Sequence, residues 1–80
     1  MAYPNPARDV MYFAVKQGGA GMVEISIANV AGDAAARLKQ DCPAGTSVLA
    51  WDCRNVAPGI YLVQVRCADG NKVFKVAIVK

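Results

Sequence analysis

Short stretches of alternating apolar and polar residues follow one another along almost the whole chain. Val23, Ile25 and Ile27 alternate with Glu24 and Ser26, which is the period of two expected of a strand with one face on a core. Similar patterns occupy residues 11–15, 46–51, 60–67 and 72–80. Turn residues between these stretches recur about every 8–12 residues. The pattern predicts an all-β fold, an antiparallel β-sandwich of six to seven short strands like immunoglobulin and fibronectin type III domains.

Glycine, proline and aspartate mark the predicted turns. Gly18-Gly19-Ala20-Gly21 lacks the lysine and hydroxyl residue of a phosphate-binding loop, and we interpret it as a hairpin loop. Pro43-Ala44-Gly45 predicts the next turn, and Asp69-Gly70-Asn71 predicts a hairpin before a last strand over residues 72–80. Trp51 and Tyr61 are expected to be core aromatics, each with a partner for its polar end.

One segment fits two kinds of secondary structure. Residues 34–38 read Ala-Ala-Ala-Arg-Leu, which has high helix propensity, and Asp33 could cap the start of a helix. A helix of about seven residues is unstable without tertiary contacts, whereas a strand of that length is ordinary. The pattern therefore favours a strand here, with the short helix as the alternative.

The residue types that usually perform catalysis are scarce. The chain contains no histidine, so it lacks the commonest general base and the commonest metal ligand. No spacing marks a carboxylate pair among the six acidic residues, and the three cysteines form no C-x-x-C motif of a zinc site. We expect no enzymatic activity, no metal and no cofactor.

Charge and length limit the partners and the domain count. The nine basic residues are dispersed, whereas a nucleic-acid-binding protein clusters them, so no nucleic acid is expected. No apolar run approaches the roughly 20 residues that span a membrane, so no membrane insertion is expected. Residues 1–80 are expected to form a single domain. We interpret Met1-Ala2 as residues added to an excised domain that begins at Tyr3, because no signal peptide pattern follows them.

The three cysteines leave two alternatives open. With consecutive antiparallel strands, Cys42 and Cys67 fall at one end of the sandwich and Cys53 falls at the other. A Cys42–Cys67 disulfide would close a loop of about 25 residues and stabilise the domain by roughly 3 kcal/mol. The alternative is three free thiols.

Several short motifs occur in an order that resembles one family. They are Tyr3-Pro4-Asn5-Pro6-Ala7, Val30-Ala31-Gly32, Trp51-Asp52, the stretch from Gly59 to Val65 and the terminal stretch from Lys75 to Lys80. Together they resemble the C-terminal sorting domains of proteins exported by the type IX secretion system of Bacteroidetes. They are similar as well to the related immunoglobulin-like domain of the flagellar hook-capping protein. The chain departs from the family pattern at Cys53, where a glycine usually follows Trp-Asp.

The resemblance implies a non-catalytic sorting signal that directs a larger cargo protein through the periplasm to the cell surface or the medium. Its implied partners are the outer-membrane translocon, a shuttle protein and a sortase-like peptidase. The strand from Gly59 to Val65 and the last strand would carry recognition, through Gly59, Tyr61, Val63, Val65, Lys75, Val76, Ile78, Val79 and Lys80. The alternative is a structural immunoglobulin-like module of an extracellular protein or filament, which would self-associate. A third possibility, carbohydrate binding, requires an exposed coplanar pair among Trp51, Tyr3, Tyr12 and Tyr61.

Overall fold

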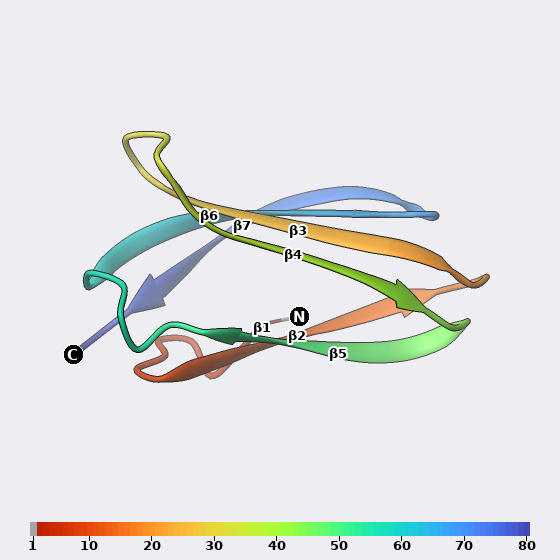
Figure 1. The fold of residues 1–80 in the computed structure, drawn as a ribbon, viewed down its shortest axis with the longest axis horizontal. Coiled ribbons are helices and arrows are strands. Elements are labelled where there is room, and N and C mark those ends of the chain that lie inside the picture. The colour runs from red at the N-terminus through yellow and green to blue at the C-terminus, as the bar shows by residue number, and fades with distance from the viewer. Residues whose placement is uncertain (1) are drawn as a thin grey trace.

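The alternating stretches form seven strands in the computed structural model, which describes residues 2–80 (Figure 1). The strands are β1 (Ala2–Tyr3), β2 (Val10–Gln17), β3 (Gly21–Asn29), β4 (Ala34–Cys42), β5 (Gly45–Asp52), β6 (Gly59–Cys67) and β7 (Gly70–Ile78). Residues 2–80 contain no helix. The expected all-β class and the upper end of the expected strand number are confirmed.

The strands form two antiparallel sheets that face each other (Figure 1). One sheet has the order β1-β2-β5 and the other has the order β4-β3-β6-β7. The chain crosses between the sheets from β2 to β3, from β4 to β5 and from β5 to β6. This three-plus-four division with repeated crossings is the sandwich architecture of immunoglobulin-like and fibronectin type III domains.

The hairpin predicted at residues 18–21 is wrong. These residues connect β2 to β3, which lie in different sheets and do not pair. The turn instead packs beside the β6–β7 hairpin, where the Gly18 N–H donates to Asp69 Oδ2 at 2.8 Å. A glycine-rich turn between two amphipathic strands has the same sequence pattern whether the strands pair in a hairpin or lie in opposite sheets. In both cases one face of each strand lies on the core.

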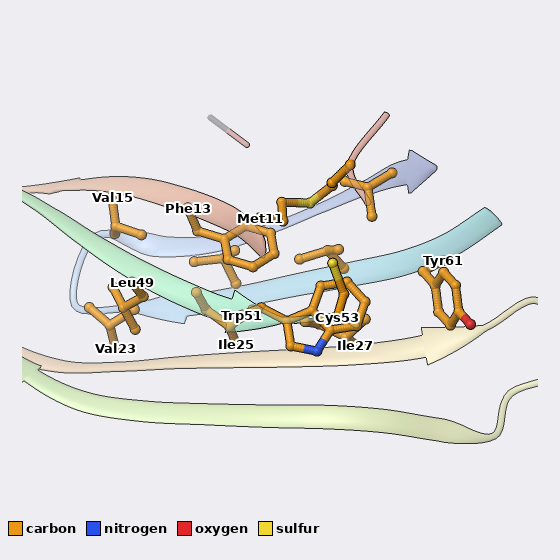
Figure 2. Close-up of a cluster of buried hydrophobic side chains, with 14 of the residues drawn as sticks. Met11, Phe13, Val15, Val23, Ile25, Ile27, Leu49, Trp51, Cys53 and Tyr61 are labelled. Carbon is orange, nitrogen blue, oxygen red and sulfur yellow. The ribbon is translucent and has the colours of Figure 1, made fainter. Parts of the chain in front are cut away.

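Apolar side chains from both sheets fill the space between them (Figure 2). Met11, Phe13 and Val15 of β2 face Val23 and Ile25 of the opposite sheet, and all five are buried. The strands β2, β3, β5 and β6 alternate buried residues with more exposed ones, as the period of two requires. The single core unites the two sheets.

The segment with helix propensity is a strand, as favoured. Residues 34–42 form β4, which pairs along its whole length with β3, and the register shifts once between Ile27 and Ala28. Asp33 does not cap a helix; Asn29 Oδ1 accepts hydrogen bonds from the Ala31 and Asp33 N–H groups in the turn before β4. Pairing with β3 satisfies the backbone of β4, and that tertiary context overrides the propensity of alanine.

Trp51 and Tyr61 are both buried, as expected. Their rings meet edge to face with centroids 5.8 Å apart. The Tyr61 hydroxyl donates to the Ala57 carbonyl four residues upstream, which resembles the tyrosine corner of immunoglobulin-like sandwiches. This bond fixes the loop that carries the chain from β5 to β6.

The last strand begins and ends two residues earlier than expected. Cys67 pairs with Gly70, so the hairpin turn consists of Ala68 and Asp69 rather than residues 69–71. Gly70 carries the positive φ, 128°, and no residue other than glycine does so among residues 2–80. At the other end Val79 leaves the strand, and its N–H donates to the Ala7 carbonyl at 2.9 Å.

The residues before β2 close one side of the sandwich. Ala7 is buried and forms a parallel bridge with Ile78, while Ala2 pairs with Phe13 of β2. The expectation that Met1 is an added residue lies outside the described residues. Ala2, which belongs to the same expectation, packs on the core.

Candidate recognition surface

The predicted recognition residues divide between the core and the surface. Five of the nine are buried, namely Tyr61, Val63, Val65, Val76 and Ile78. The other four are exposed, namely Gly59, Lys75, Val79 and Lys80. A partner that binds the folded domain can therefore touch the second group, while the first group holds β6 and β7 in place.

The intervening residues of β6 and β7 form a partly apolar outer surface, here called the outer hairpin face. It consists of Ile60, Leu62, Val73, Lys75 and Ala77. Ile60 lies opposite Ala77 and Leu62 lies opposite Lys75 in the register of the two strands. The exposed fractions of Ile60, Leu62 and Val73 are 46%, 37% and 66%. Sequence reasoning placed recognition on these two strands but named mostly the residues that point inward.

The side chain of Lys80 joins the two sheets at one end of the sandwich. Its ammonium group donates to the carbonyl oxygens of Arg8 at 3.0 Å, Cys53 at 2.8 Å and Arg54 at 3.0 Å. These carbonyls lie just before β2 and just after β5, in the three-stranded sheet, whereas Lys80 follows β7 of the other sheet. The resemblance named Lys80 for recognition, and no sequence signal pointed to this structural role.

Metal binding and sugar stacking each require a particular group of side chains. Across residues 2–80 no group of three histidine, cysteine or acidic side chains could hold a metal ion. Tyr3 and Tyr12 are an exposed aromatic pair, but their planes are tilted by 32° rather than coplanar. Trp51 and Tyr61 are buried and cannot stack on a ligand.

Comparison with known proteins decides the family. The family model described as the secretion system C-terminal sorting domain matches residues 1–80. No curated protein matches the chain. The chain belongs to the secretion system C-terminal sorting domain family. The resemblance to type IX sorting domains noted in the sequence is thereby confirmed over residues 1–80.

The sorting domain is a C-terminal signal for type IX secretion, carried as a module of a larger cargo protein. It directs that cargo through the periplasm to the cell surface or the medium, and it is recognised by protein components of the secretion machinery. Residues 2–80 contain no helix that is long and apolar enough to cross a membrane.

The departure at Cys53 is accommodated in the sorting domain without a positive φ. Cys53 has negative φ, is fully buried, and its N–H donates to the Asp9 carbonyl at 2.8 Å. Burial raises the pKa of its thiol. The turn is made instead by Asp52, whose Oδ1 accepts from the Arg54 N–H at 3.1 Å. The cysteine is therefore a small buried apolar group rather than a reactive thiol.

The predicted Cys42–Cys67 disulfide is not formed in the sorting domain. Cys42, Cys53 and Cys67 are all free. Cys42 and Cys67 lie at the same end of the four-stranded sheet, but β3 separates their strands. Two strand spacings amount to about 10 Å, whereas a disulfide needs Cα atoms within about 7 Å. The alternative of three free thiols describes the structure.

The Asp52 carboxylate of the sorting domain is expected to have an unusually low pKa. Its pKa falls from 3.8 to about 2, chiefly because the Arg54 guanidinium donates two hydrogen bonds to it, at 3.0 and 2.8 Å. A lowered folded-state pKa means that this carboxylate contributes stability above pH 4, and the contribution is lost as the pH falls through about 2. We expect carbon-detected NMR to give a midpoint for Asp52 near 2, and R54A to raise it toward 3.8.

The R8A variant is the control for the Asp52 titration. R8A removes an arginine that makes no contact with the Asp52 carboxylate, so the Asp52 midpoint is expected to stay in place. An Asp52 midpoint that is the same in R54A and in the parent chain would contradict the assignment to Arg54.

Proposed function

We propose that this sorting domain is recognised as a folded surface, and that the outer hairpin face and the end of the chain beside it form that surface. The supporting observation is the burial of Tyr61, Val63, Val65, Val76 and Ile78, since an export signal read as an extended peptide would not need these side chains in a core. The folded hairpin then presents the alternate residues of the same two strands. No catalytic step by the domain itself is involved.

The family resemblance supplies the proposed partners. They are the outer-membrane translocon, a shuttle protein, and a sortase-like peptidase that removes the domain and attaches the cargo to surface lipopolysaccharide. Exposed apolar residues such as Ile60 and Leu62 are typical of protein-binding surfaces when they are contiguous. Their position on one face supports a protein partner for the outer hairpin face.

Export of a reporter fused to the 80-residue chain tests the proposal in a host with a type IX system. We expect L62K to reduce export at least about tenfold, because a charge at an apolar contact costs more than about 1.4 kcal/mol of binding. The fold should survive because Leu62 is 37% exposed.

The matched control is V48K on the solvent-facing side of β5, where Val48 is 50% exposed. It introduces the same charge on the other sheet and should leave export unchanged. Thermal unfolding of both isolated variants checks that the domain remains folded. Equal export of the L62K and V48K fusions would reject the outer hairpin face as the recognised surface.

A second candidate function is that of an immunoglobulin-like packing module, related to the hook-capping domain. The apolar character of the outer hairpin face favours it, because a self-associating module needs such a surface. Sedimentation that shows concentration-dependent oligomers, lost in the L62K variant, would support it over recognition by export machinery.

A further inference from the structure

The edge of β7 is open along only half of its length. In an antiparallel ladder each residue directs its N–H and its C=O to the same side. Ala77 directs both away from β6, because its N–H donates to Asn5 Oδ1 at 3.0 Å and its C=O accepts from the Ala7 N–H at 3.0 Å. The register with β6 continues without a shift, so Asn71, Val73 and Lys75 direct their backbone groups to the same side.

Among residues 2–80, no strand pairs with this part of β7, which we call the open edge and define as residues 71–75. The residues before β2 occupy only the other half, where Ala7 pairs in parallel with Ile78. That bridge shows that an extended segment fits beside β7. The open edge has room for about five more strand residues and roughly six backbone hydrogen bonds.

A groove of about 670 Å³ lies beside the open edge, between β2 and the β6–β7 hairpin. Phe13, Val15, Val65 and Phe74 are the large apolar residues of its lining. It exists because β1 pairs with only Tyr12 and Phe13 of β2, so the sheet above β7 is narrow at this end. A strand added to β7 would place every second side chain in the groove, and apolar side chains fit there.

The charges around the open edge are mainly positive. Lys16 and Lys72 line the groove, and Lys75 lies on the open edge itself. Asp69 is the acidic residue of the lining, and its carboxylate already accepts from the Gly18 N–H. A second copy of this edge would bring like charges together, as edge lysines do in proteins that avoid self-pairing. An acidic strand is favoured instead.

We propose that the open edge of β7 binds an extended acidic segment of a partner protein as an added strand, with alternate apolar residues of that segment in the groove. The inference rests on the proposed function for the partner, which is a component of the export machinery. Backbone pairing would supply the affinity, and the lysines would select against basic segments.

Proline at position 73 tests the added strand. The outward N–H of Val73 takes no part in pairing with β6, so V73P leaves the domain's own ladder intact while it removes a donor to the partner. We expect V73P to lower export of the reporter fusion about tenfold, the effect of losing one backbone hydrogen bond in binding. V73A removes the same side chain from the outer hairpin face and keeps the donor, so V73P is compared with V73A, and export of the V73P fusion should be about tenfold lower than export of the V73A fusion.

Amide hydrogen exchange gives a direct reading of the contact. A seven-residue peptide that alternates valine with glutamate should slow exchange of the Val73 and Lys75 N–H groups in the isolated 80-residue chain. A peptide that alternates valine with lysine should not. Equal protection by both peptides, or by neither, would overturn the proposal.

The remaining outcomes separate this inference from the function on which it rests. If the parent fusion is not exported, the proposed function fails. If the parent fusion is exported and the V73A and V73P fusions are exported equally, only the added strand fails. A dimer in sedimentation that V73P abolishes would identify a second copy as the occupant and overturn the acidic partner.

Discussion

F13A is expected to destabilise the domain by about 3–5 kcal/mol, the usual cost of removing a buried phenylalanine. Phe13 is 1% exposed and lies among the buried side chains of the core (Figure 2). The centroid of its ring is 6.4 Å from that of Phe74. A domain of this length has a free energy of unfolding of roughly 4–12 kcal/mol, so this loss would leave much of the chain unfolded. Urea unfolding followed by tryptophan fluorescence measures it through Trp51.

The matched control for this prediction is V48A on the neighbouring strand of the same sheet. Val48 faces solvent on the other side of β5, so its truncation should change the free energy of unfolding by less than about 0.5 kcal/mol. Similar losses in F13A and V48A would mean that the two faces of this sheet are not divided into core and surface.

K80M is expected to cost about 1–2 kcal/mol of the free energy of unfolding, although Lys80 is exposed. The substitution keeps the length of the side chain but removes the ammonium group that donates to three carbonyl oxygens. Hydrogen bonds to a charged group contribute more than neutral ones, while exposure to solvent reduces the gain. Urea unfolding measures the loss, and faster exchange of the Val79 N–H should accompany it.

The comparison for Lys80 is K75M, on the solvent-facing side of β7. Among residues 2–80, no ion pair or side-chain hydrogen bond involves Lys75, so its neutralisation should change the free energy of unfolding by less than about 0.5 kcal/mol. Unfolding of K80M at the same urea concentration as K75M would rule out a structural role for the Lys80 ammonium group.

These two predictions bear on how the sorting domain works. Phe13 tests whether the recognised form is folded, because F13A should lose export together with structure. Lys80 tests whether the end of the chain must be held against the three-stranded sheet, because K80M should remain folded. Comparing export of the two fusions with their unfolding therefore separates loss of the fold from release of the chain end.

The alternation of apolar residues determined most of the strands and the buried faces of β2, β3, β5 and β6. Val23, Ile25 and Ile27 could be assigned to a core from their spacing alone, because a strand places alternate side chains on opposite sides. The ordered motifs likewise determined the family, which the match over residues 1–80 confirms. Even the alanine-rich segment could be assigned correctly, since its length suits a strand better than a helix.

Only the tertiary structure decided which strands are neighbours and what the residues at the ends of strands contact. The turn at residues 18–21 connects two sheets, β3 separates Cys42 from Cys67, and Lys80 reaches the loops beside β2 and β5. The physical reason is that alternation records the environment of each residue along its own strand, whereas pairing order and end contacts depend on segments distant in the chain. The open edge of β7 arises in the same way, from the short β1 and the place where residues 5–7 end their pairing.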